Sequence, residues 1–175
     1  LDDVERTLTV DDLLIVDGDD RPVGIAGIMG GADCEISDQT TDVLLEMAWF
    51  DPTSISRTSR RLGLRSEASA RFEKGADPGV VALAADRFCE LAAEICGAST
   101  EPVQVDVRGT LPSRPAVRVR TARVNALLGT ELSPSRTAAL LAPLGFASVP
   151  VDDDHDVAAP TWRCAPDRHE ALRHR

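Results

Sequence analysis

Residues 13–28 read LLIVDGDDRPVGIAGI, and this stretch decides the first element of the fold. Two apolar runs, residues 13–17 and 23–28, flank an acidic turn that contains glycine and proline. Apolar runs joined by such a turn are typical of two antiparallel strands. The second run continues into adjacent glycines at Gly30 and Gly31, which permit positive φ angles and the close approach of another group. The stretch therefore predicts a β-hairpin that ends in a glycine-rich loop.

The residues after the hairpin predict a further strand and a helix. Residues 41–48 (TDVLLEMA) have the composition of a largely buried strand. Asp51 suits the N-cap of a helix and Pro52 suits its first turn, and Gly63 suits its end. This helix is expected to turn Ile55 inward and its three arginines outward.

The clearest helix of the sequence covers residues 78–96, after a polar segment at residues 69–75. Its apolar residues recur every three or four positions, which indicates one apolar stripe. Gly97 is a suitable C-terminal stop.

The character of the sequence changes near residue 112. Residues 103–107 (VQVDV) alternate as a last strand does, and prolines follow at 112 and 115. Beyond them we expect a strand at 117–120, a helix at 121–128, a second helix from 134 to about 145 and a strand at 157–159. We therefore predict an α+β chain. Residues 1–111 form a mixed or antiparallel sheet with packed helices, and residues 112–175 form a small helical domain with short strands.

Composition excludes several classes of protein. The chain has 175 residues, a net charge of −10 and no uncharged apolar stretch of the roughly 18 residues that a membrane span needs. This acidity argues against wrapping of nucleic acid, although a site for the end of an RNA stays open.

The sequence lacks the usual patterns of metal ligands. No Cys-x-x-Cys pair occurs, and the three histidines lie late in the chain at unsuitable spacing for zinc. The acidic segment Asp152–Asp156 lacks the glycine and distal glutamate of a calcium loop. We expect no metal site, and a solvated hairpin turn at Asp152–Asp156.

Several longer strings carry more information than patterning does. They are residues 22–31 (PVGIAGIMGG), 44–52 (LLEMAWFDP), 57–69 (RTSRRLGLRSEAS) and 71–78 (RFEKGADP). In this order and spacing they closely resemble the editing domain of the bacterial phenylalanyl-tRNA synthetase β subunit. Residues 118–129, 141–146 and 159–163 resemble the small helical domain that follows it, and the resemblance ends after Arg163.

The resemblance implies hydrolysis of mischarged Tyr-tRNA(Phe). An apolar pocket built for Phe rejects an added hydroxyl by only about a hundredfold, so Tyr is sometimes attached and must be removed at a second site. By motif position, Glu46 corresponds to the residue that recognises the Tyr hydroxyl. A carboxylate suits this task because it accepts the phenol hydrogen in a charge-assisted bond.

The other residues carried over from the family complete the pocket. Ser66 and Ala68 correspond to its small residues, with Ser66 standing where many relatives have Thr. Gly27 and Gly30 fall on the loop whose lack of side chains leaves room for the amino acid. The family also uses a His and an Asn from a segment that would precede Leu1, and this chain has no His before His155. We therefore expect no catalytic residue here, and no editing by this chain alone.

The resemblance also implies a cytoplasmic parent enzyme that attaches Phe to tRNA(Phe) with ATP and magnesium. Its partners would be the 3′ end of tRNA(Phe) and an α subunit, in a heterotetramer of two α and two β subunits, with no membrane contact. No cofactor is expected in this segment.

Other interpretations stay open. Glu46 could be a structural carboxylate paired with Arg57 or Arg61. These two arginines and Arg60 could form a solvated helix face, could approach the tRNA terminus, or could pair with Glu67 or Glu73. The chain could instead be a non-catalytic RNA-binding or subunit-contact module, whose dense basic stretch is Arg114, Arg118, Arg120 and Arg123. It could also be an inactive truncated fragment.

Overall fold

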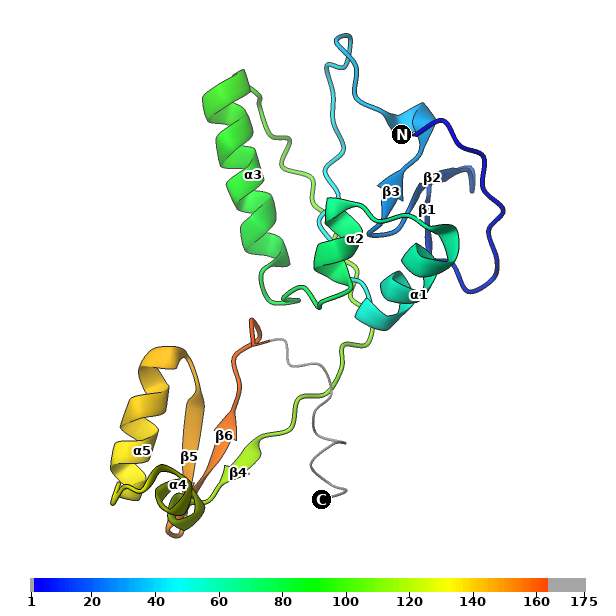
Figure 1. The fold of residues 1–175 in the computed structure, drawn as a ribbon. Helices are drawn as coiled ribbons and strands as arrows, with labels where there is room; N and C mark the ends of the chain where they lie inside the picture. Colours follow the sequence, from blue (N-terminus) through cyan, green and yellow to red (C-terminus); the bar gives the residue numbers. More distant parts are fainter. Residues whose placement is uncertain (1, 164–175) are drawn as a thin grey trace. The chain divides into compact units, whose positions relative to one another are not determined.

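The structure is a computed structural model that describes residues 2–163. Its helices and short antiparallel sheets confirm the predicted α+β class (Figure 1). The described chain divides into an N-terminal unit, residues 2–102, and a C-terminal unit, residues 103–163. Residues 164–175 lie outside the described residues.

The predicted hairpin is present in the N-terminal unit. Strands β1 (Leu14–Val16), β2 (Pro22–Ile25) and β3 (Met29–Gly30) form an antiparallel sheet in that order. A tight turn joins β2 to β3, in which the amide of Ile28 donates to the carbonyl of Ile25 at 3.0 Å. The glycine-rich loop thus begins with an ordered turn, and a short 3-10 helix, η1 (Ala32–Cys34), follows it.

Helix α1 (Pro52–Leu62) confirms the second prediction. The Asp51 side chain accepts a hydrogen bond from the amide of Ser54 at 2.8 Å, and Gly63 ends the helix in the left-handed conformation. Ile55 is 2% exposed and forms a core with Ile28 and Leu64. This core joins the turn after β2 to α1, while the arginines of α1 are exposed as expected.

Helix α2 (Glu67–Phe72) was not predicted. It overlaps the start of residues 69–75, which the sequence indicated only as a polar segment. Its start is a capping box, in which the hydroxyls of Ser66 and Ser69 each accept a hydrogen bond from the other residue's amide, at 3.0 and 2.9 Å. Such a box satisfies amides that a helix leaves unpaired at its N-terminus. It allows a helix of six residues to form beside the core.

Helix α3 (Val81–Cys96) is the predicted long helix, and it ends at Gly97 as expected. It starts three residues later than predicted, because Pro78–Val80 form a turn and a bend. None of its residues is buried, and its apolar stripe includes Phe88 and Ile95, which are 44% and 75% exposed.

Two predicted strands are wrong. Residues 41–48 and 103–107 have no regular secondary structure, and Leu44 and Val105 are 99% and 83% exposed. A strand needs a neighbour for its backbone amides and carbonyls. Neither segment pairs with a strand among residues 2–163, so alternating apolar residues alone did not produce one.

The C-terminal unit contains the sheet β4 (Val117–Val119), β6 (Asp154–Ala158) and β5 (Ala147–Val151), antiparallel in that order. Helices α4 (Thr121–Leu128) and α5 (Pro134–Leu141) confirm the two predicted helices, and η2 (Ala142–Leu144) extends the second. Strand β5 was not predicted.

The acidic segment of the C-terminal unit is only partly the solvated turn that was expected. The hairpin turn is confined to Asp152 and Asp153, because β6 already begins at Asp154. His155 inside this strand is 4% exposed, and Val157 beside it is 5% exposed. The alternation of a strand therefore turns part of the acidic segment toward the core.

Candidate binding hollow

One hollow of the N-terminal unit gathers all five residues that the sequence marked as candidate site residues. It has a volume of about 490 Å³ and opens beside β2 and β3. Glu46, Ser66, Ala68, Gly27 and Gly30 line it, although they come from three separate segments of the chain. A hollow of this size is within the range of about 300–1,000 Å³ of pockets that hold small ligands.

Glu46 reaches the hollow from the irregular segment that precedes α1. Glu46 is an exposed residue, but neighbouring atoms remove part of the hydration of its carboxylate and raise its pKa above the usual value. Neither of the arginines considered as its partner pairs with it among the described residues, since Arg61 binds Asp12 instead. The Glu46 carboxylate is thus not neutralised by a described cation and keeps its acceptor atoms available.

Ser66 and Ala68 lie at the first turn of α2. The Ser66 hydroxyl donates to the carbonyl of Ile28 at 2.5 Å and accepts from the amide of Ser69 at 3.0 Å. Ser69 is fully buried and also donates to the carbonyl of Ser66 at 3.0 Å. The N-terminus of α2 is therefore fastened to the turn after β2.

Gly27 has a structural reason to be glycine. Its φ of +65° is unfavourable for residues with a side chain, and an added Cβ would stand 2.9 Å from Cδ2 of Phe50. Ile55 and Phe72 would each be 3.1 Å away. The space beside Gly27 is thus filled by the aromatic pair Phe50 and Phe72, whose rings meet edge to face at 5.2 Å.

Two polar links hold the segments around the hollow. Asp12 is almost fully buried at its side chain, where it accepts from the hydroxyl of Thr58 at 2.9 Å and forms an ion pair with Arg61. Arg61 holds the pKa of Asp12 well below its usual value. The indole of Trp49 donates to the carbonyl of Ala76 at 3.0 Å. These links tie α1 to the N-terminal loop and the Glu46 segment to residues after α2.

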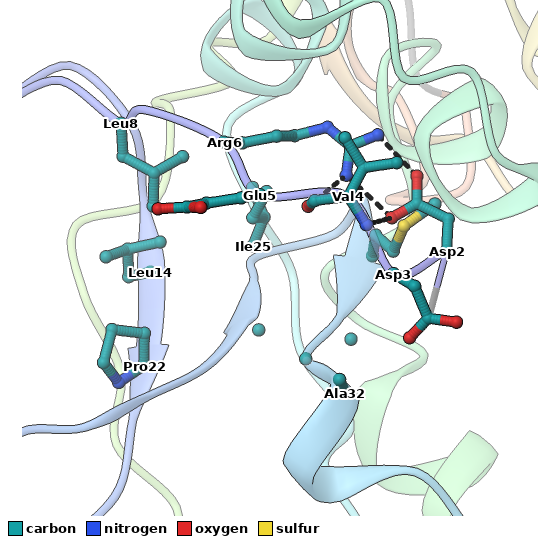
Figure 2. Close-up of a pocket in the computed structure, with 14 residues that line it drawn as sticks. Asp2, Asp3, Val4, Glu5, Arg6, Leu8, Leu14, Pro22, Ile25 and Ala32 are labelled. Atoms are coloured by element: carbon teal, nitrogen blue, oxygen red, sulfur yellow. Dashed lines mark hydrogen bonds and ion pairs between the residues drawn. The ribbon is translucent and has the colours of Figure 1, made fainter.

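The opposite face of the same sheet carries a second hollow (Figure 2). Leu14 and Pro22 line it, whereas their neighbours Ile15 and Val23 line the first hollow, as expected for side chains that alternate across a sheet. Figure 2 shows the side chain of Arg6 ending at the carboxylate of Asp2, with which it pairs at 2.5 Å. The chain thus covers part of this face with its own N-terminal segment.

The expected pairs of the α1 arginines with Glu67 or Glu73 are wrong for the described residues. Glu67 pairs with Arg71 at 3.3 Å and Glu73 with Arg65 at 3.8 Å. Local geometry decides this, because Glu67 and Arg71 are one helical turn apart.

No metal site or membrane span is found within residues 2–163. No three side chains of His, Cys, Asp or Glu come together there as ligands of a metal ion. No helix in this part of the chain is both long and apolar enough to cross a bilayer.

Two arginines of the basic stretch in the C-terminal unit bind other residues of the same unit. The guanidinium of Arg118 binds the carboxylate of Asp156 through two contacts of 2.6 and 3.2 Å. Arg114 donates to the carbonyl of Thr161 at 2.8 Å. Arg120 and Arg123 are exposed, and neither side chain forms an ion pair within residues 2–163.

Sequence reasoning missed the apolar part of the hollow. Met29, Met47, Phe50 and Phe72 line it beside the five candidates. They stood inside or next to the quoted strings, but nothing in the strings separated pocket residues from core residues. Ser69 was also missed, although its spacing of three from Ser66 is the signal of a capping box.

Comparison with known proteins gives two matches along the chain. Residues 1–97 match the B3/4 domain family, and residues 117–170 match the tRNA synthetase B5 domain family. The second match continues past Arg163, so the expectation that the resemblance ends there is wrong. The phenylalanine–tRNA ligase β subunit of Geobacter sulfurreducens is 48% identical over 93% of this chain, and that of Halalkalibacterium halodurans is 47% identical over 93%. The corresponding subunit of Corynebacterium diphtheriae is 43% identical over 93% of the chain. The aligned part is about a fifth of the length of these relatives.

Proposed function

Since this chain belongs to the B3/4 domain family and is a segment of a bacterial phenylalanine–tRNA ligase β subunit, we propose that its hollow is part of an editing site. The site hydrolyses Tyr-tRNA(Phe), and the hollow of the N-terminal unit receives the Tyr side chain. In this proposal residues 1–111 are the C-terminal part of the editing domain, and residues 112–175 are the small helical domain after it.

The observation that carries the proposal is the gathering of Glu46, Ser66, Ala68, Gly27 and Gly30 around one hollow. Apolar side chains form much of its wall and suit an aromatic ring, and one carboxylate without a described cationic partner suits the phenol hydroxyl. With Phe in the hollow the carboxylate would be partly desolvated without a partner, at a cost of roughly 1–3 kcal/mol.

Selectivity and hydrolysis are separate tasks in this proposal. Glu46 recognises Tyr, and no described residue is assigned as the catalytic group. A His and an Asn from outside this chain would act on the ester, so the chain by itself is not expected to edit. Measurable deacylation of Tyr-tRNA(Phe) by the isolated chain, at a rate near that of a complete synthetase, would refute this division.

The test of the proposed function is Glu46→Ala in a complete β subunit assembled with its α subunit. We expect the ratio of kcat/KM for Tyr-tRNA(Phe) over Phe-tRNA(Phe) to fall by about 10- to 100-fold, because the bond to the phenol is lost. The rate of Tyr-tRNA(Phe) hydrolysis should fall by a smaller factor than this ratio does. Glu67→Ala is the matched control, since Glu67 is an exposed carboxylate that pairs only with Arg71 among the described residues. Equal loss of selectivity and hydrolysis in Glu46→Ala would refute the assignment.

We propose further that the parent enzyme attaches Phe to tRNA(Phe) with ATP and magnesium in the cytoplasm. Its partners are the tRNA(Phe) 3′ end and an α subunit, in a heterotetramer of two α and two β subunits. In this proposal the synthetic reaction belongs to other parts of the enzyme.

A second function, RNA or subunit contact by the C-terminal unit, is supported by the exposed side chains of Arg120 and Arg123. Arg118 supports it less, because its guanidinium already binds Asp156. Replacement of Arg120 and Arg123 by Glu should weaken tRNA binding without unfolding the unit if this function is correct. Unchanged tRNA affinity would favour the editing site as the functional part of the segment.

A further inference from the structure

The Ser66 hydroxyl is fully engaged as a donor inside the protein. Its hydrogen goes to the carbonyl of Ile28 at 2.5 Å, and its oxygen accepts the amide of Ser69 at 3.0 Å. A serine hydroxyl has a single hydrogen to donate. While this bond persists, Ser66 cannot donate to a ligand in the hollow.

The acceptor of this bond lies in the turn that shapes the hollow. Ile28 is 3% exposed, and its own amide closes the turn by donating to the carbonyl of Ile25 at 3.0 Å. Gly27 is inside this turn, and Gly30 follows it two residues after Ile28. The position of the turn therefore determines where both glycines face the hollow.

The opposite end of the link is equally well defined. Ser69 is fully buried, and it bonds both the amide and the carbonyl of Ser66 at 2.9 and 3.0 Å. The backbone of Ser66 can thus not move independently of α2. One short hydrogen bond joins a rigid helix start to the glycine turn, 38 residues earlier in the chain.

We propose that Ser66 is a positioning residue, which holds the glycine turn of residues 25–30 at the wall of the hollow and makes no donor contact to the substrate. This inference rests on the proposed editing function and assigns Ser66 a different part in it from Glu46. Glu46 discriminates between Tyr and Phe. Ser66 sets the shape of the hollow for any aromatic amino acid, so its loss affects both esters equally.

Ser66→Ala, Ser66→Thr and Ser59→Ala test the proposal in a complete β subunit assembled with its α subunit. Ser59 is the matched control, because its hydroxyl also donates to a buried carbonyl, that of Leu64, but does not line the hollow. We expect Ser66→Ala to lower kcat/KM about tenfold for Tyr-tRNA(Phe) and Phe-tRNA(Phe) alike, because small displacements of binding groups reduce rates strongly. Ser66→Thr, which keeps the hydroxyl, should stay within about twofold of the wild type. Ser59→Ala should lower Tm about as much as Ser66→Ala does, and it should leave kcat/KM unchanged.

Amide hydrogen exchange in the same proteins gives a readout that is independent of activity. Ser66→Ala should speed exchange at the amides of Ile28 and Gly31, which bond the carbonyls of Ile25 and Val23, and Ser59→Ala should not. Exchange unchanged by Ser66→Ala, or a shift of the Tyr-to-Phe ratio like that of Glu46→Ala, would overturn the positioning role. Absence of Tyr-tRNA(Phe) editing by the wild-type enzyme would refute the proposed function. The hydrogen-exchange result would still decide the role of Ser66.

Discussion

The sheet of the C-terminal unit has strands of three to five residues, whereas the sheet of the N-terminal unit has strands of two to four, and residues 35–51 of the N-terminal unit lie outside any strand or helix. Helix α5 packs on β5 and β6 of the C-terminal unit, whose buried residues are Thr121, Thr137, His155 and Val157. The N-terminal unit has a small apolar core of Ile28, Ile55 and Leu64, and polar links hold the segments around it.

This difference teaches that the two units depend on different interactions. In the N-terminal unit single side chains such as Asp12 and Ser66 connect distant parts of the chain, so the hollow depends on a few hydrogen bonds. In the C-terminal unit backbone pairing between strands connects the parts, and side-chain bonds such as that of Arg118 to Asp156 add to it. Tryptophan fluorescence can follow the units separately, because Trp49 lies in the first and Trp162 in the second.

The largest effect is expected from Asp12→Ala. This change leaves the buried Thr58 hydroxyl without its acceptor and the partly exposed Arg61 without its ion pair. The first loss costs about 1–3 kcal/mol and the second up to about 1 kcal/mol, so a total of about 3 kcal/mol is expected. Urea unfolding of Trp49-only and Trp162-only variants measures each unit, and only the first should lose stability. Equal losses in both units would contradict the comparison.

The same pair has a definite dependence on pH. The pKa of Asp12 is lower in the folded chain than its usual value of 3.8, so its stabilising contribution is complete above that value. The contribution disappears as pH falls through the folded pKa. The difference between wild type and Asp12→Ala should therefore shrink only under strongly acidic conditions.

A smaller loss is expected from Gly27→Ala, about 2–3 kcal/mol. The added methyl group would meet Phe50, Ile55 and Phe72, and the positive φ adds strain. Gly63→Ala is the control, because Gly63 has the same φ of +65° but no atom within 4 Å of an added Cβ. It should lose only about 1 kcal/mol in chemical denaturation. Equal losses would show that the aromatic pair does not fill the space beside Gly27.

A change of about 1 kcal/mol is expected at two buried threonines of the C-terminal unit. The Thr121 hydroxyl has no hydrogen-bond partner among the described residues, while that of Thr137 donates to the carbonyl of Ser133 at 3.1 Å. Thr121→Val should stabilise the unit, because it removes an unpaired buried hydroxyl, and Thr137→Val should destabilise it. Thermal unfolding followed at Trp162 measures both. The same sign in both variants would disagree with this account.

The smallest effect concerns the pH dependence of selectivity at the hollow. Neighbouring atoms remove part of the hydration of the Glu46 carboxylate and raise its pKa, so it becomes protonated at a higher pH than a fully hydrated glutamate does. The preference for Tyr over Phe should be present above this pKa and should decline as pH falls through it. Tyr-to-Phe ratios of kcat/KM across pH 4–7 measure this, with Glu46→Gln as a variant whose ratio should not depend on pH. A ratio independent of pH in the wild type would count against the ionised carboxylate as the reader of the hydroxyl.

Sequence predicted the elements that are stabilised locally. The hairpin of residues 13–28, the helix capped by Asp51 and the helices after Arg120 and Ser133 carry their own start or stop signals. The strands expected at residues 41–48 and 103–107 did not form, because a strand depends on a partner that local sequence does not specify.

The candidate site could be predicted in its members but not in its internal bonds. Family strings indicated Glu46, Ser66, Ala68, Gly27 and Gly30, which line one hollow. They did not indicate that Ser66 donates to Ile28 or that Arg61 pairs with Asp12. Such contacts join residues 38 and 49 positions apart, and they depend on how the helices pack.

The most direct test of the central claim, that Glu46 reads the hydroxyl of Tyr, compares tRNA(Phe) carrying Tyr with tRNA(Phe) carrying O-methyltyrosine. The methyl ether keeps the ring and the oxygen but has no hydrogen to donate. With a complete wild-type subunit we predict that deacylation favours Tyr by about tenfold or more, and that Glu46→Ala removes this preference. A preference for Tyr that persists unchanged in Glu46→Ala would contradict the account.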